Sequence, residues 1–304
     1  MSRVSRFARP FRVATGRDFT LRGIDPRDTG EIKSKQQAER WLVRGVARLS
    51  RLQEKLHAQD RWALLLIFQA MDAAGKDGTI KHVMSGVNPQ GCQVYSFKAP
   101  SSEELDHDFM WRTTRCLPER GRIGIFNRSY YEETLVVRVH PEILAGQRLP
   151  PSLVSRRIWH ERYEDINAFE RYATRNGIAI RKFFLHVSHE EQRRRLLRRL
   201  DRPTKNWKFS ATDAQTRKHW KPYMHAYEEL IRETSTPYAP WYVVPADNKW
   251  FTRLVVAAAV IDALEEMKLA FPKVSRETRK ELAVVRAALD GELRNRKSRP
   301  EAAA

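Results

Sequence analysis

Residues 62–79 read WALLLIFQAMDAAGKDGT, an apolar run that leads directly into a short loop of small residues. The run at 62–68 has the length and the continuous apolar character of a strand that is buried on both faces. The loop after it contains Gly75, Lys76 and Gly78. A strand, a glycine-containing loop and a helix N-terminus form an anion site, because backbone N–H groups and the helix dipole favour negative charge. This stretch therefore predicts a central strand followed by a phosphate-binding loop.

The loop departs from the common G-x-x-x-x-G-K-[ST] pattern at both ends. Ala70 stands at the first glycine position, and Asp77 follows the lysine, so that the nearest hydroxyl belongs to Thr79. Asp72 is also unusual, because phosphate repels a carboxylate unless a metal ion or an acceptor group lies between them. We interpret Lys76 as a phosphate ligand and Asp72 as a residue that holds Mg²⁺ or orients the phosphate acceptor. A solvated Lys76 and a turn-forming Asp72 are the structural alternatives.

The rest of the chain alternates between strand-like and helical patterns. Apolar runs of strand length occur at 92–97, 122–126, 178–187 and 241–244. Helical patterns occur at 33–57, 79–87, 101–115 and 155–177. This alternation indicates a mostly parallel sheet that helices cover on both faces. We therefore expect an α/β protein with a five-stranded sheet in a three-layer α/β/α arrangement.

Composition suggests one folded domain with a basic segment at its start. Residues 1–31 mix Arg, Pro and Gly with few periodic apolar positions and are expected to form an extended basic arm. The main domain is expected at 32–272. The tail at 273–304 carries one short amphipathic pattern, at Leu282, Val285 and Leu289, before a polar end that we expect to be frayed.

The charge is the strongest global feature: 56 Lys and Arg against 37 Asp and Glu give a net charge of +19 over 304 residues. Such an excess attracts polyanions, while 41% hydrophobic residues suffice for a core and argue against disorder. Two cysteines, Cys92 and Cys116, lack the spacing of a zinc site or a disulfide scaffold. No run is long enough to cross a bilayer, and the N-terminus has no secretory apolar segment. We expect a cytoplasmic protein.

A second group of polar residues follows the run at 122–126. This run ends in Asn127 and Arg128, with Glu132 and Glu133 close behind. Ligands of open α/β sheets bind at the carboxyl ends of the strands. Arg128 can clamp a phosphoryl group with two hydrogen bonds, and Glu132 can serve a metal ion or the acceptor. On spacing alone, a surface turn with an Arg–Glu pair explains these residues equally well.

A basic element spans 189–208, HEEQRRRLLRRLDRPTKNWK. Leu196, Leu197 and Leu200 mark an apolar face, which leaves the remaining surface to Arg193, Arg194, Arg195, Arg198 and Arg199. Like charges at this spacing repel one another, so an anionic ligand is expected, although a solvated face is the usual alternative. The segment NWKF, which contains Lys208, is expected to close over the anion, and Lys98 is expected at the same edge.

Together these stretches resemble the polyphosphate kinase 2 family, the polyphosphate:nucleotide phosphotransferases. The resemblance covers roughly residues 62–267 and rests on QAMDAAGKDGTIKHVMSGVNPQGCQVYSFKAPS, EELDHDFMWR, GIFNRSYYEE, HEEQRRRLLRRLD, WKFS and APWYVVPADNKW. It implies a P-loop kinase-like fold with a helical lid at about 189–225. It also implies Mg²⁺-dependent transfer of the terminal phosphate of polyphosphate to nucleoside mono- or diphosphates, with Mn²⁺ as an alternative ion. The direction of transfer stays open, and the family forms homodimers or homotetramers.

The resemblance also assigns residues by position. It places Asp72 and Lys76 in the Walker A motif, and Asn127, Arg128 and Glu132 in the Walker B region. Catalytic roles are expected for Asp72, Lys76 and Arg128, nucleotide binding for Asp72, Asn127 and Glu132, and Mg²⁺ ligation for Asp72 and Glu132. Beyond the resemblance, the net charge leads us to expect a basic channel for polyphosphate, lined by Lys76, Lys81, Arg128 and the arginines of the lid. The residues expected to bind polyphosphate are Gly75, Lys76, Asp77, Gly78, Thr79, Lys81, Lys98, Arg193, Arg194 and Lys208.

Asn127, followed by Arg128 and Ser129, resembles the class III branch, whose members accept both mono- and diphosphates. Two residues depart from the family pattern: Ala70 replaces a glycine, and Lys221 replaces an aspartate on the outer lid. An ATP-dependent nucleoside monophosphate kinase shares the loop, sheet and lid and remains an alternative, as does a non-catalytic polyanion binder. Neither a specific nucleic acid nor a membrane is expected as a partner.

Overall fold

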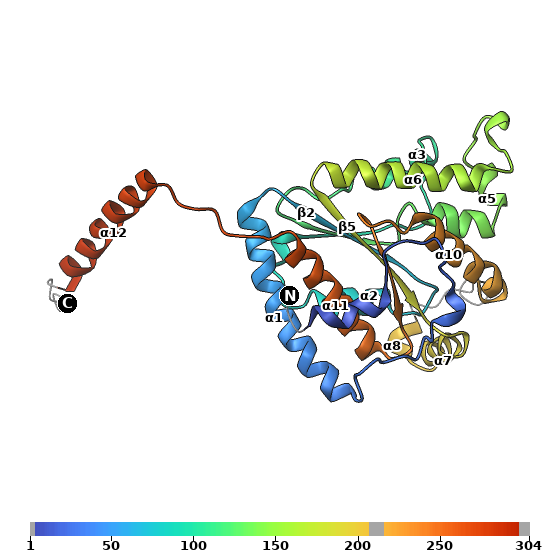
Figure 1. Cartoon of the computed structure of the whole chain (residues 1–304), viewed down its shortest axis with the longest axis horizontal. Coiled ribbons are helices and arrows are strands. Elements are labelled where there is room, and N and C mark those ends of the chain that lie inside the picture. The colour runs from blue at the N-terminus through green and yellow to red at the C-terminus, as the bar shows by residue number, and fades with distance from the viewer. Residues whose placement is uncertain (1–3, 207–215, 298–304) are drawn as a thin grey trace. The chain divides into compact units, whose positions relative to one another are not determined.

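The computed structural model describes residues 4–206 and 216–297 (Figure 1). The chain divides into two compact units, Met1–Leu269 and Ala270–Ala304. The first unit contains the sheet and all of the predicted site residues that the structure describes. Within the described residues no helix is both long and apolar enough to cross a membrane.

A six-stranded sheet forms the centre of the first unit in the described part of the chain. Its strands are β1 (Arg12–Val13), β2 (Ala63–Gln69), β3 (Cys92–Ser96), β4 (Ile123–Asn127), β5 (Ile178–His186) and β6 (Trp241–Pro245). They lie in the order β1-β6-β5-β2-β4-β3, and all neighbours are parallel except β1 and β6. The expected parallel strands are confirmed, and β1 is an antiparallel addition that the pattern analysis missed.

The central strand β2 explains the position of the site. Every residue of β2 is buried, as its continuous apolar run predicts. It pairs with β4 on one side and with β5 on the other. The chain leaves β2 toward β3 and β4 and later crosses to β5, so strand order reverses at the carboxyl end of β2. Ligands of open α/β sheets bind at such a reversal.

Helices cover both faces of the sheet, which confirms the α/β fold. On one face α11 (Lys249–Glu266) packs with α1 (Lys35–Gln59) and α2 (Lys76–Val83), and on the other α6 (Ile158–Arg175) packs with α10 (Trp220–Thr234) (Figure 1). The shorter helices are α3 (Ser102–Leu105), α4 (Trp111–Thr114), α5 (Glu142–Ala145), α7 (His189–Leu200) and α8 (Pro203–Asn206). The described residues also form 3-10 helices: η1 (Ser5–Phe11) has seven residues, and η2 (Leu21–Gly23), η3 (Pro89–Gly91), η5 (Pro151–Leu153) and η6 (Arg217–His219) are single turns. The segment η4 (Glu133–Val137) is a π-helical turn.

The N-terminal segment is packed rather than extended, which corrects the sequence interpretation. Val4, Phe7, Ala8 and Phe11 are all buried, and the spacing of these residues places them on one side of η1. The Phe11 ring packs edge to face on Phe251 of α11, with centroids 5.7 Å apart. Arginines alternate with these apolar residues, so the sequence analysis did not recognise the short apolar pattern. This pattern is sufficient to pack the segment against the core.

Two helical expectations are also corrected. Residues 101–115 form α3 and α4 rather than one helix, and between them Asp108 Oδ1 accepts a hydrogen bond from the Met110 N–H at 2.9 Å, which closes a local turn. In the second unit, α12 (Arg276–Lys297) contains the expected amphipathic pattern and continues to Lys297, into the start of the polar end that we expected to be frayed. Residues 298–304 of that end lie outside the described residues. In α12, Leu282, Val285 and Leu289 are exposed, each by more than half.

Candidate active site

The loop between β2 and α2 has a strained backbone. Gly75 precedes the first residue of α2 with φ of 107°, a conformation that residues with a Cβ atom rarely adopt. Ala73 also lies in the left-handed region, with φ of 61°. Such conformations persist only where surrounding contacts impose them, and they concentrate at functional sites. The loop therefore has the geometry expected of a ligand-binding turn.

Lys76 lies at the start of α2 and turns back over the loop. Its Nζ donates a hydrogen bond to the Ala70 carbonyl at 2.9 Å. Burial, and secondarily the Arg128 charge, lower the pKa of Lys76, whereas Asp72, Glu132 and Asp77 oppose the shift. The Lys76 amine is therefore held at the point where the loop meets three carboxylates.

Arg128 joins the two predicted halves of the site. Its backbone N–H donates to the Phe68 carbonyl at 3.0 Å, which places it beside the end of β2. Its guanidinium bridges two carboxylates: Nη2 lies 3.1 Å from Asp72 Oδ1, and Nη1 lies 3.1 Å from Glu132 Oε2. These charges, with Glu132 first, raise the pKa of Arg128. The residue has φ of 67°, so the turn after β4 is strained as well.

Asn127 occupies the position where many nucleotide-dependent phosphotransferases have an acid. Its Nδ2 donates to Asp77 Oδ1 at 3.0 Å and lies 3.4 Å from Ser96 Oγ. Asp77 stands in the first turn of α2, where a negative charge is favourable. The amide of Asn127 therefore ties the end of β4 to the start of α2, and Asp77 contacts this amide.

Two carboxylates are available for a divalent ion. Within residues 4–206 and 216–297, no three His, Cys, Asp or Glu side chains form a ready-made metal cluster. Asp72 and Glu132 nevertheless lie on either side of one guanidinium, each with an oxygen 3.1 Å from a different nitrogen of Arg128. Mg²⁺ commonly uses only one or two protein carboxylates and completes its shell with phosphate oxygens and water. The donor set thus fits Mg²⁺.

A pocket of about 470 Å³ opens beside Arg128 and Glu132. Its walls include Lys98 and Phe109, and Phe109 packs against the Arg162 guanidinium at 4.3 Å. Glu133, also in the wall, bonds to Arg162 and Gln147, while burial raises the pKa of Glu133. An apolar pocket with a few fixed polar groups suits a small ligand. Sequence reasoning gave Phe109 and Arg162 no role, although EELDHDFMWR carried part of the resemblance.

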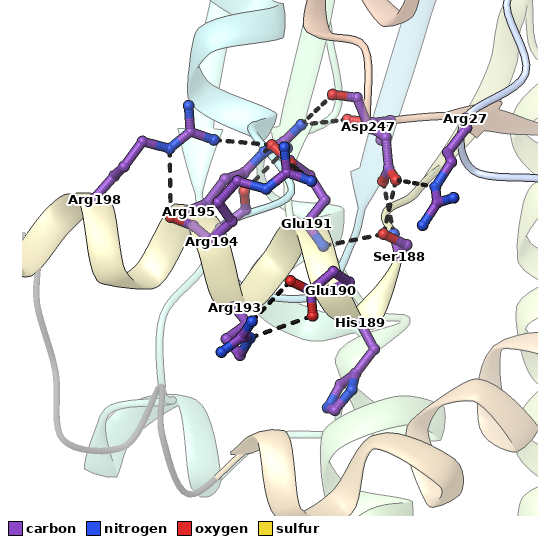
Figure 2. Close-up of polar contacts among 12 residues, drawn as sticks. Arg27, Ser188, His189, Glu190, Glu191, Arg193, Arg194, Arg195, Arg198 and Asp247 are labelled. Carbon is purple, nitrogen blue, oxygen red and sulfur yellow. Dashed lines mark hydrogen bonds and ion pairs between the residues drawn. The ribbon is translucent and has the colours of Figure 1, made fainter.

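The basic element at the carboxyl end of β5 is only partly as expected. Figure 2 shows three arginines of α7 around Glu191, which is buried and pairs with Arg194, Arg195 and Arg198 at 3.1, 2.7 and 3.0 Å. Arg193 pairs with Glu190 instead, at 2.9 Å. Acidic residues of the same helix therefore offset much of the repulsion that the sequence suggested.

Three α7 residues depart from the prediction. Arg195 is buried with its side chain 4% exposed, although the pattern placed it on the surface. Leu197 and Leu200 are about half exposed, so Leu196 alone is buried among the three leucines. Backbone carbonyls near the phosphate loop accept hydrogen bonds from Arg195, and this outweighs the usual preference of a guanidinium for water.

The other predicted phosphate ligands have mixed positions. Lys81 and Lys98 are exposed, as are Arg193 and Arg194 of α7. Gly78 lies in the first turns of α2, and Thr79 beside it is buried. Lys208 lies outside the described residues. The structure therefore brings Asp72, Lys76, Arg128 and Glu132 together, whereas the expected polyphosphate channel stays a prediction.

Comparisons with known proteins give a consistent result. A family model described as polyphosphate kinase 2 matches residues 32–272. The chain is 52% identical over 280 residues to the ADP-polyphosphate phosphotransferase of Rhodopseudomonas palustris, covering 92% of this chain and 97% of the relative. It is 44% identical over 264 residues to the AMP/ADP-polyphosphate phosphotransferase of Meiothermus ruber, covering 86% and 95%. It also resembles the crystal structure of polyphosphate kinase 2 from Arthrobacter aurescens TC1, with a TM-score of 0.84, 41% identity and coverage of 92% and 96%.

Proposed function

The chain belongs to the polyphosphate kinase 2 family, and on that premise we propose that it transfers the terminal phosphate of inorganic polyphosphate to nucleoside mono- and diphosphates. The observation that supports this most directly is the Arg128 guanidinium between Asp72 and Glu132, beside Lys76 and at the edge of the pocket. A cation between two acids can contact both the donor and the acceptor phosphate.

The residues of the loop and of the turn after β4 perform the transfer by position and charge. Lys76 and Arg128 neutralise the phosphoryl group as it passes from the polyphosphate end to the acceptor. Asp72 and Glu132 orient Arg128 through the two ion pairs. Phosphoryl transfer has a loose transition state, so alignment of the two substrates carries most of the catalysis and no covalent enzyme intermediate is needed.

A divalent ion is expected as the cofactor, with Mg²⁺ first and Mn²⁺ as an alternative. Asp72 and Glu132 would hold it. When bound, the ion supplies positive charge to the phosphate oxygens. Both carboxylates pair with Arg128, so the residues that would hold the ion also orient the arginine.

We assign the acceptor nucleotide to the pocket lined by Phe109 and Glu133, with Asn127 and Glu132 at its phosphate end. The aromatic ring and the buried polar groups there suit a nucleobase. The names of the two relatives, which specify ADP and AMP/ADP, support acceptance of ADP and AMP. Polyphosphate approaches from the side of Lys81 and α7, whereas Lys98 lies in the wall of the nucleotide pocket. We also propose a cytoplasmic homodimer or homotetramer.

The test is an incubation without ATP, in which the purified protein receives polyphosphate, Mg²⁺ and either AMP or ADP. ATP formed from both acceptors, and lost in a Lys76→Ala variant, supports the proposal. ATP from ADP alone would restrict the acceptor to diphosphates. Conversion of AMP to ADP with ATP as the donor, and none with polyphosphate, would replace the proposal with an ordinary nucleoside monophosphate kinase.

A further inference from the structure

Arg195 differs from the exposed arginines of α7, because every N–H group of its guanidinium donates a hydrogen bond to another group of the protein. A guanidinium has five N–H groups, and each of those in Arg195 finds an acceptor. The acceptors are Glu191 Oε1 at 2.7 Å and the carbonyls of Ala73 at 3.2 Å, Ala74 at 2.6 Å, Ala246 at 2.6 Å and Asp247 at 2.9 Å. Arg195 therefore has no N–H group left for a phosphate.

These contacts fall on the strained part of the phosphate loop. Arg195 binds the carbonyls of Ala73 and Ala74, and Gln192, one turn earlier in α7, donates to the Asp72 carbonyl at 3.0 Å. Three consecutive carbonyls thus point toward α7. In a planar trans peptide the N–H of the following residue points the opposite way. These contacts, which we call the Arg195 clamp, therefore turn the N–H groups of Ala73, Ala74 and Gly75 away from α7. The Ala74 N–H then donates to the Met71 carbonyl at 3.2 Å, so the N–H groups of Ala73 and Gly75 are the ones directed toward a ligand.

The same guanidinium anchors the loop to a second strand. Ala246 and Asp247 follow β6, and the Asp247 carboxylate accepts hydrogen bonds from the N–H and the hydroxyl of Ser188, which precedes α7 (Figure 2). Arg195 consequently joins three elements at one point: the loop after β2, the segment after β6 and α7. Ala73 holds its positive φ within this junction.

We propose that Arg195 is a positioning residue, which fixes the direction of the phosphate-loop amides without touching the substrate. The inference rests on the proposed phosphoryl transfer. It separates the α7 arginines by role: Arg194 and Arg198 are 61% and 50% exposed and can meet a polyanion, whereas Arg195 serves the loop. Glu191 pairs with all three guanidinium groups and so links the two exposed arginines to Arg195.

The experiment compares Arg195→Ala and Arg195→Lys with a matched control, Arg181→Ala. Arg181 is also buried, bonds to a backbone carbonyl and pairs with Glu266, but it packs toward the end of α11. Thermal unfolding and circular dichroism establish that each variant is folded. Then kcat and KM are measured for tripolyphosphate and for ADP, with and without added guanidinium. An equal concentration of NaCl serves as the control for ionic strength.

We expect both Arg195 variants to lose roughly one hundredfold in kcat/KM, the usual effect of an ångström-scale misplacement of reacting groups. The loss should fall mainly on kcat, and guanidinium should restore part of it in Arg195→Ala. Lysine keeps the charge but not the planar fork, so Arg195→Lys should fail as well. Arg181→Ala should keep nearly the wild-type kcat/KM.

Normal turnover in Arg195→Ala overturns the inference. So does full activity in Arg195→Lys, which would mean that only charge matters. Equal losses in Arg195→Ala and Arg181→Ala without guanidinium rescue would also overturn it, because they indicate general destabilisation. If Arg195→Ala does not fold, the kcat/KM of Arg195→Lys tests the inference in its place. Wild-type protein without polyphosphate-dependent turnover would reject the proposed function instead, and calorimetric binding of tripolyphosphate to wild type and Arg195→Lys would then test the clamp alone.

Discussion

Arg128 shows how a single side chain connects two motifs that lie far apart in the sequence. The acids on either side of it were each predicted near phosphate, but only the fold reveals that one guanidinium bridges them. The sequence placed Asp72, Lys76, Arg128 and Glu132 at one edge of the sheet because each follows a strand-like run. It could not reveal Arg195, whose five acceptors come from three separate segments.

At this scale the first prediction concerns Lys76. Lys76→Ala should lower kcat by roughly two to three orders of magnitude, as the loss of one preorganised charge donor commonly does. The melting temperature should change little, because burial already opposes the charge of this lysine. Steady-state kinetics and thermal unfolding measure both effects. Lys35→Ala on the exposed start of α1 serves as the control, and activity close to wild type in Lys76→Ala would remove the phosphate-loop assignment.

Among the elements, strands were easier to predict than helices. The run at 62–68 is apolar without interruption because both faces of β2 are buried, so the sequence alone predicted a strand there. The run at 178–187 contained two cations that pattern analysis could not explain. The structure gives a partner to each of them: Arg181 pairs with Glu266 of α11, and Lys182, which is fully buried, pairs with Glu170 of α6 at 2.6 Å. Such a pair depends on contacts between distant elements, which periodicity does not encode.

This buried pair gives the second prediction. Lys182 Nζ also donates to Tyr131 Oη and to the Thr234 carbonyl, and Tyr130 and Tyr131 donate to Glu170. Lys182→Met should lower the free energy of unfolding by about 3–5 kcal/mol, because it leaves the Glu170 charge buried without its partner. Lys182→Met combined with Glu170→Gln should cost less than the two single changes together. Urea unfolding of the three variants measures this, and strictly additive losses would contradict the coupling.

For the whole molecule, acid stability should depend on His186. Burial lowers its pKa from 6.5 to about 4, although Asp247 and Asp25 oppose the shift. Between these values the unfolded chain binds the proton more readily than the folded chain does. Stability should therefore fall as pH falls from 6.5 toward 4, by about 3 kcal/mol for this group.

A His186→Phe variant tests this dependence. It keeps the ring beside Phe184 but removes the titrating group. Unfolding by urea at pH 7 and near pH 4.5 should show a smaller difference in free energy for the variant than for the wild type. An equal difference in both proteins would mean that other groups govern acid stability.

The net charge of +19 leads to a prediction about salt. A long polyanion interacts with many cations at once, whereas a nucleotide contacts few, so screening should weaken polyphosphate binding more. KM for long polyphosphate should thus rise more steeply with NaCl than KM for ADP. Parallel salt dependence for both substrates would argue against an extended basic track.

The pairing of β1 with β6 constrains how the protein is completed during synthesis. Arg12 emerges from the ribosome early, but its partner Tyr242 is made near the end of the sheet. Until then Phe11 cannot pack on Phe251, and the edge of β5 that later receives β6 stays open to other chains. A ribosome that stalls before β6 therefore leaves a nascent chain whose exposed β5 edge can pair with other chains. Chaperone binding to this edge matters most in the last stage of translation.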